Sequence, residues 1–233
     1  MGQPNSAMKK LILTLVAFVV WSALIGWKVT LIAMSGLWIH GMGHILVARH
    51  YGMKTSGIYF IPLLGAVEPI GIEQDNLWQM AMVSLAGPFA GVINTALLYG
   101  IGYVINSEVA IAAAGVVAVI NLFNLIPLSP LDGGRAMQAL MVSAFQKAWV
   151  GMIPLAIICF AFLRIIGVSP IMFIFLSVIA VVQIKKEMDT QQAEEEGKLQ
   201  TPRIRLNLRE FLYVMGIYTT LTIVLLEFII LSS

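Results

Sequence analysis

The sequence predicts an all-α polytopic membrane protein with about six to seven transmembrane helices. Of its 233 residues, 59% are hydrophobic and only 11% are charged, whereas an ordinary soluble domain has about 25% charged residues. The mean hydropathy is +0.91. A soluble fold of this length could not bury so much apolar surface, so the composition excludes a soluble enzyme, a disordered chain and a DNA-binding module. The net charge of +2 is too small to indicate a nucleic-acid partner.

Apolar stretches recur along the chain at lengths suited to crossing about 30 Å of hydrocarbon, which takes roughly 20 helical residues. The first two are nearly continuous. As one helix they would run about 57 Å, so we expect a tight hairpin or a break near Ser35 and Gly36. The stretches are 11–27, 29–48, 78–105, 109–130, 148–166, 168–184 and 211–231.

The basic residues indicate which side of the membrane each loop occupies. If the amino terminus is cytoplasmic, only two of the 14 lysines and arginines, Lys28 and Arg164, lie on the outer side of the membrane. This distribution is a strong positive-inside bias. We expect a multi-pass protein of a prokaryotic cell membrane. The linker that joins the last two spans has acidic and basic runs, so it is either solvated or in contact with anionic lipid head groups. The expected parts are an amino-terminal cytoplasmic segment or tag (1–10), a membrane core (11–184), a cytoplasmic linker (185–210) and a last transmembrane helix (211–233).

Residues 55–76 are apolar, but they are too broken by proline and glycine to form a spanning helix. Pro62, Gly65, Pro69 and Gly71 all lie in this segment. Non-helical backbone survives at membrane depth only where protein or a water-filled cavity covers it. We therefore expect a short re-entrant or membrane-associated segment resembling a β-hairpin.

All three histidines lie between positions 40 and 50. His40 and His44 are four residues apart, so a helix presents them on one face. Imidazoles at this spacing can bind one metal ion, as in the H-E-x-x-H zinc motif, or they can each hydrogen-bond to a neighbouring helix. His50 follows Arg49 at the expected helix end and is predicted to be interfacial.

A catalytic zinc site usually has three protein ligands and an open position. The other candidate ligand is Asp132, which follows a stretch where Pro127 and Pro130 break the helix. It is either a ligand or a turn former. The predicted topology puts Asp132 and the histidine pair in the same, cytoplasmic half of the membrane.

Small residues interrupt the span at 78–105. Ala86, Gly87 and Pro88 are followed two turns later by Asn94. Such residues let helices approach closely, so this segment either packs against a neighbouring helix or has a structural role beside the site.

Three elements, in this order along the chain, resemble the site-2 protease family of intramembrane zinc metalloproteases. They are the helix with His40 and His44, the Ala86–Pro88 segment with Asn94, and the segment from Asn124 to Gly133. The resemblance covers about 36–140 and includes the apolar hairpin around residues 60–65. It implies Zn²⁺ as the cofactor, cleavage of transmembrane helices, and a single-span membrane protein as substrate. It implies zinc ligands at His40, His44 and Asp132, supporting residues at Asn94, Asn124, Pro127 and Gly133, and substrate-binding residues at Pro62 and Gly65.

The sequence departs from the family at the position of the general base. The family's helix reads H-E-x-x-H, whereas Gly41 follows His40 here. Losing a general base typically costs about 10²–10⁴ in rate. Glu68, in the hairpin, is the nearest candidate replacement. We consider two hypotheses: an impaired variant of an active protease, engineered or natural, and a pseudoprotease that binds membrane helices as regulator or chaperone.

Overall fold

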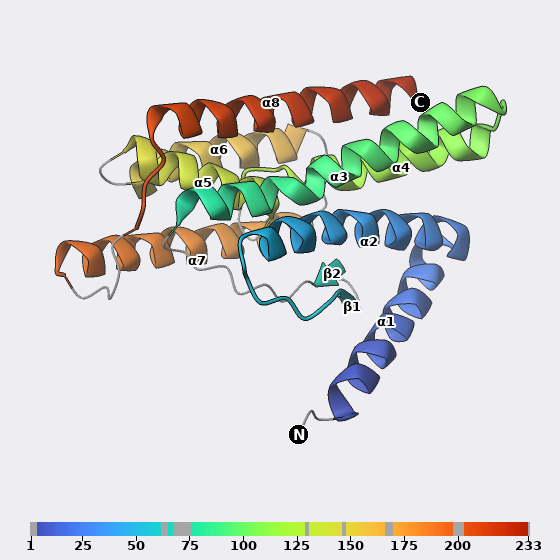
Figure 1. The fold of residues 1–233 in the computed structure, drawn as a ribbon, viewed down its shortest axis with the longest axis horizontal. Coiled ribbons are helices and arrows are strands. Elements are labelled where there is room, and N and C mark those ends of the chain that lie inside the picture. The colour runs from blue at the N-terminus through green and yellow to red at the C-terminus, as the bar shows by residue number, and fades with distance from the viewer. Residues whose placement is uncertain are drawn as a thin grey trace. The chain divides into compact units, whose positions relative to one another are not determined.

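The computed structural model describes residues 4–61, 65–67, 76–128, 131–145, 148–165, 170–197 and 203–232. These residues form helices and one short β-hairpin (Figure 1). The helices are α1 (Pro4–Ile25), α2 (Trp27–His50), α3 (Leu77–Val104), α4 (Glu108–Asn124), α5 (Asp132–Ala144), α6 (Ala148–Ile165), α7 (Pro170–Glu195) and α8 (Leu208–Leu231).

The prediction of an all-α polytopic membrane protein is confirmed. Within the described residues, four helical segments are long and apolar enough to cross a membrane, and α4 and part of α6 are shorter apolar helices. The four segments are Met8–Ile25, Trp27–His50, Leu77–Val104 and Leu208–Leu231.

The chain divides into two compact units, which we describe separately. The first comprises Met1–Gly71, Ala86–Phe123 and Leu221–Ser233, and the second comprises Ile72–Leu85 and Asn124–Thr220.

In the first unit, the predicted break between the first two spans lies at Gly26 and not near Ser35. Gly26 has φ 84°, a left-handed conformation that glycine adopts without steric cost. Helix α2 continues through Gly36, which is a packing residue. A Cβ on Gly36 would lie 2.9 Å from a methyl group of Val117, so this glycine allows α2 and α4 to approach.

Helices α2 and α3 also approach closely through small residues. A Cβ on Gly43 would collide with the carbonyl oxygen of Ala86 and lie 2.8 Å from the Cβ of Ala90. Pro88 lies inside α3, and the helix continues past it. The Ala86–Pro88 segment therefore packs against the histidine helix, as the composition of small residues predicts.

The broken segment after α2 forms the expected hairpin. Strand β1 (Tyr59–Ile61) pairs with β2 (Gly65–Val67) in antiparallel register, with Phe60 opposite Ala66. Helix α1 contacts β1: the Phe60 N–H donates to Thr14 Oγ1 at 3.2 Å. The Lys10 ammonium donates to the Ser56 carbonyl at 2.7 Å.

The helix predicted at 109–130 ends earlier, at Asn124, where the chain enters the second unit. A non-helical turn follows, in which the Leu131 N–H donates to the Leu128 carbonyl at 3.0 Å. Helix α5 then begins at Asp132. The reason for the early end is Pro127, because the residue before a proline is pushed out of the helical conformation.

Helix α7 continues to Glu195 and so includes the first part of the expected linker. The segment after it folds back, and the Arg203 guanidinium binds Glu187 at 2.7 Å and Glu194 at 2.9 Å. Glu187 also accepts a hydrogen bond from Gln138 on α5. Burial lowers the pKa of Arg203, but the hydrogen bonds and charges of both glutamates outweigh burial and raise it above its usual value. A buried charge with this many partners is compatible with folding.

Candidate metal centre

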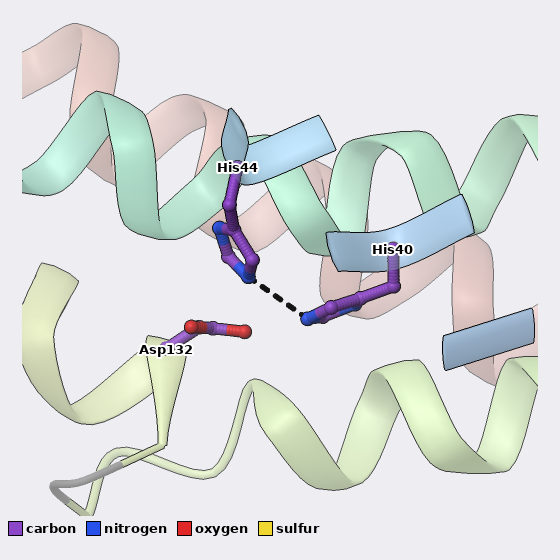
Figure 2. Close-up of side chains that lie close together, drawn as sticks. All are labelled: His40, His44 and Asp132. Carbon is purple, nitrogen blue, oxygen red and sulfur yellow. Dashed lines mark hydrogen bonds between the residues drawn. The ribbon is translucent and has the colours of Figure 1, made fainter. Parts of the chain in front are cut away.

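The two histidines lie on one face of α2, as their spacing predicts. Their side chains are buried, with His40 4% and His44 5% exposed. The two Nε2 atoms lie 3.0 Å apart, and the rings meet edge to face with centroids 4.7 Å apart. Figure 2 shows both rings projecting from α2 so that these nitrogens face each other.

A buried asparagine determines which nitrogen of His40 is available. The Asn121 amide nitrogen donates to the Val117 carbonyl at 2.8 Å, so its oxygen faces His40 Nδ1, 2.7 Å away. An amide oxygen only accepts hydrogen bonds. His40 Nδ1 therefore carries the proton, and Nε2, which lies 3.0 Å from His44 Nε2, is the nitrogen that can bind a metal ion. This arrangement is common in metal-binding histidines.

Asn121 is a site residue that sequence reasoning missed. Asn94 was expected beside the site, but the asparagine bonded to His40 is Asn121, one turn before Asn124. A signal was present, because an asparagine in an apolar span is costly without a partner. The Asn121 amide fits against α3 because Gly91 has no side chain there: a Cβ on Gly91 would collide with this amide.

Gly87 lies directly beside both histidines. A Cβ on Gly87 would collide with His44 Nε2 and lie 2.7 Å from His40 Nε2. The absence of a side chain at this position lets both Nε2 atoms lie directly against the backbone of α3. The Ala86–Pro88 segment therefore borders the site in addition to packing against α2.

Asp132 is the first residue of α5 and is 8% exposed. The chain turns tightly here, because a Cβ on Gly133 would collide with the Leu125 carbonyl and lie 2.8 Å from that of Ile126. Among the residues that the structure describes, His40, His44 and Asp132 are the group whose ligand atoms all lie within 4.8 Å of one another (Figure 2).

The chemistry of this donor set suits zinc. Two imidazoles and one carboxylate, with a fourth position left open, are the ligands of many catalytic zinc sites. All three side chains are buried, and buried polar groups of this kind need partners. The proton on His40 Nδ1 and the 3.0 Å approach of the two Nε2 atoms fit a site in which both of these nitrogens bind one metal ion.

The other residues expected at the site lie in several elements. Gly41 is buried within α2 and contributes no carboxylate. Asn124 ends α4 and is half-buried, as is Pro127 in the turn that follows. Gly65 begins β2. Pro62 and Glu68 lie outside the described residues, and His50 is exposed at the end of α2, as expected of an interfacial residue.

The chain is similar to members of one metallopeptidase family. Residues 28–114 match the model of peptidase family M50, a range that includes both histidines. A protein of Synechocystis sp. named as a candidate zinc metalloprotease, sll0528, is 26% identical over 83% of this chain and 59% of its own length.

Shorter alignments link the chain to further relatives. Rip3 of Mycobacterium tuberculosis, also named as a candidate zinc metalloprotease, is 31% identical over 53% of this chain and 33% of its own length. Zinc metalloprotease MJ0392 of Methanocaldococcus jannaschii is 28% identical over 44% of this chain and 31% of its own length. The chain thus spans between about a third and three fifths of these relatives.

A solved structure, the site-2 protease from Methanocaldococcus jannaschii, aligns with 76% of this chain and 87% of its own, at 23% identity and a TM-score of 0.49. The match to the family model over residues 28–114 and the named relatives show that the chain is similar to peptidase family M50, and its apolar helices are those of an integral membrane protein.

Proposed function

We propose that this chain is an intramembrane zinc metalloprotease whose catalytic activity is impaired by its own sequence. In this proposal His40, His44 and Asp132 hold zinc, and Gly41 stands where the general base would be. The observation that carries it is the convergence of three buried ligand atoms within 4.8 Å. Zinc in such a site supplies Lewis acidity and makes water nucleophilic near neutral pH.

The protein's own residues prepare this site in two ways. Asn121 holds the proton of His40 on Nδ1, through the 2.7 Å contact, so that Nε2 is a donor to metal. Gly87 keeps the space beside both Nε2 atoms clear of side chains. Both contributions lie in the helices around the ligands and do not depend on position 41.

The proposed substrate is a single-span membrane protein whose cleavage site becomes extended. A helical peptide bond is shielded by its own backbone, whereas an extended segment can add to a strand edge. The hairpin offers such an edge. Strand β1 contacts α1, and β2 contacts the histidine helix α2.

The hairpin register indicates which residue would pair with the substrate. The Phe60 N–H points to Thr14 and away from β2. In an antiparallel pair, residues opposite each other alternate between bonding to each other and pointing outward. Ala66, opposite Phe60, therefore directs its N–H and C=O toward the outer edge of β2, where an extended substrate would bind.

Zinc content tests the ligand assignment. Purified full-length protein in detergent should contain one zinc per chain, and His44→Ala and Asp132→Ala should each lose most of it. His50→Ala is the matched control, because His50 lies on the same helix but is exposed; it should retain its zinc. Unchanged zinc in both ligand variants would overturn the assignment.

The second candidate function is a pseudoprotease that binds membrane helices as a regulator or chaperone. The observation that favours it is Gly41, because a buried glycine at this position cannot transfer protons. Zinc content does not distinguish the two functions, whereas a carboxylate at position 41 does. In both cases we propose a cytoplasmic amino terminus, on the basis of the positive-inside bias. We also propose a prokaryotic membrane, because the named relatives are from Synechocystis, Mycobacterium and Methanocaldococcus.

A further inference from the structure

A tyrosine far along the sequence contacts the turn that leads to Asp132. The Tyr218 hydroxyl, on α8, donates a hydrogen bond to the carbonyl oxygen of Leu125. Leu125 is the first residue after α4 and is buried. Carbonyls at the end of a helix have no partner within the helix, and leaving one unpaired at membrane depth is strongly unfavourable. Tyr218 supplies a partner for this carbonyl.

The same carbonyl packs against the first turn of α5. Gly133 packs so closely against Leu125 that a Cβ would collide with this oxygen. Asp132 immediately precedes Gly133. A displacement of the Leu125 carbonyl would therefore move the first turn of α5, and with it the carboxylate of Asp132.

Other contacts hold α5 further along its length. Gln138 donates to Glu187 at 2.8 Å, and the Leu206 N–H donates to Ser143 Oγ at 3.0 Å. These contacts fix the body of the helix from α7 and from the segment before α8. In the first turn, next to Asp132, Gly133 packs against the Leu125 and Ile126 carbonyls.

We propose that Tyr218 is a positioning residue for the metal centre, acting on Asp132 through the Leu125 carbonyl and Gly133. This inference rests on the proposed function, because it requires Asp132 to be a zinc ligand. Groups that orient metal ligands typically contribute 10–100-fold to metal affinity. A tyrosine hydroxyl that acts through the backbone should have an effect in that range.

The test compares Tyr218→Phe with Tyr213→Phe in the full-length protein in detergent. Tyr213 is on the same helix, is 52% exposed and stacks under Arg209, so its hydroxyl should have no influence on the site. Zinc affinity is measured by competition with a chelator, and coordination geometry by the visible absorption of the Co²⁺-loaded protein. We expect Tyr218→Phe to bind zinc about 10–100-fold more weakly with an altered Co²⁺ spectrum, and Tyr213→Phe to match the parent.

A second variant keeps the proposal testable if Tyr218→Phe folds poorly. Gly133→Ala pushes on the same carbonyl from the other side and should also weaken zinc binding and change the Co²⁺ spectrum. Zinc affinity and spectrum equal to the parent's in either folded variant would overturn the role of Tyr218. If instead Asp132→Ala binds zinc as tightly as the parent does, the proposed function fails, because Asp132 is then no ligand.

Discussion

Substituting Gly41 by glutamate should create or restore proteolysis. Position 41 is one residue after His40, and at 3.6 residues per turn it lies about 60° around α2 from His44. Gly43, on the opposite flank, packs against Ala86 and has no room for a side chain. A carboxylate at 41 therefore projects beside the ligands, on the flank away from that contact.

The expected gain follows from the missing proton transfer. A positioned general base contributes about 10²–10⁴ in rate, which corresponds to roughly 3–5 kcal/mol of transition-state stabilisation. Gly41→Gln is the control, because glutamine matches glutamate in size and helix propensity but cannot take up the proton.

The assay uses detergent-solubilised protein and a panel of single-span membrane substrates. Gly41→Glu should cleave at least about 10²-fold faster than the parent and Gly41→Gln, lose activity on chelation and recover it with zinc. If Gly41→Glu and the parent bind zinc and helices yet neither cuts, the pseudoprotease hypothesis replaces ours. If the parent already cuts at a similar rate, another residue is the base and our account of position 41 is wrong.

Three further predictions concern residues around the ligands. Asn121→Ala removes the acceptor for His40 Nδ1 and should weaken zinc binding about 10–100-fold; zinc competition measures it, and an unchanged affinity would refute the role of Asn121. Gly87→Ala should abolish stoichiometric zinc, measured by metal analysis, whereas Gly100→Ala on the same helix, with nothing within 4 Å of its Cβ, should not; equal zinc in both would contradict the collision at Gly87. A photo-crosslinker at Ala66 should capture an added substrate, and capture only from α8 would place the substrate elsewhere.

The sequence by itself was sufficient to predict the class of protein and two of its local features. Composition alone predicts membrane helices, because apolar surface of this extent has to be in contact with lipid. The spacing of His40 and His44 puts them on one face of a helix, since helical geometry relates residues four apart. Pro127 predicts a helix break before Asp132 because a proline restricts its own neighbours. Each of these features depends on residues close together in the chain.

Tertiary structure decided the features that depend on contacts between distant residues. Asn121 bonds to His40 across 81 residues, and Tyr218 bonds to Leu125 across 93. The spacing of residues within one helix does not indicate which polar residue of that helix will contact a residue of another helix. The position of the break between the first two spans stayed open for a related reason. Gly26 and Gly36 look alike in sequence, and only the contact with Val117 shows that Gly36 serves packing. Residue patterns can therefore suggest the ligands, whereas the packing of the helices determines the groups that orient them.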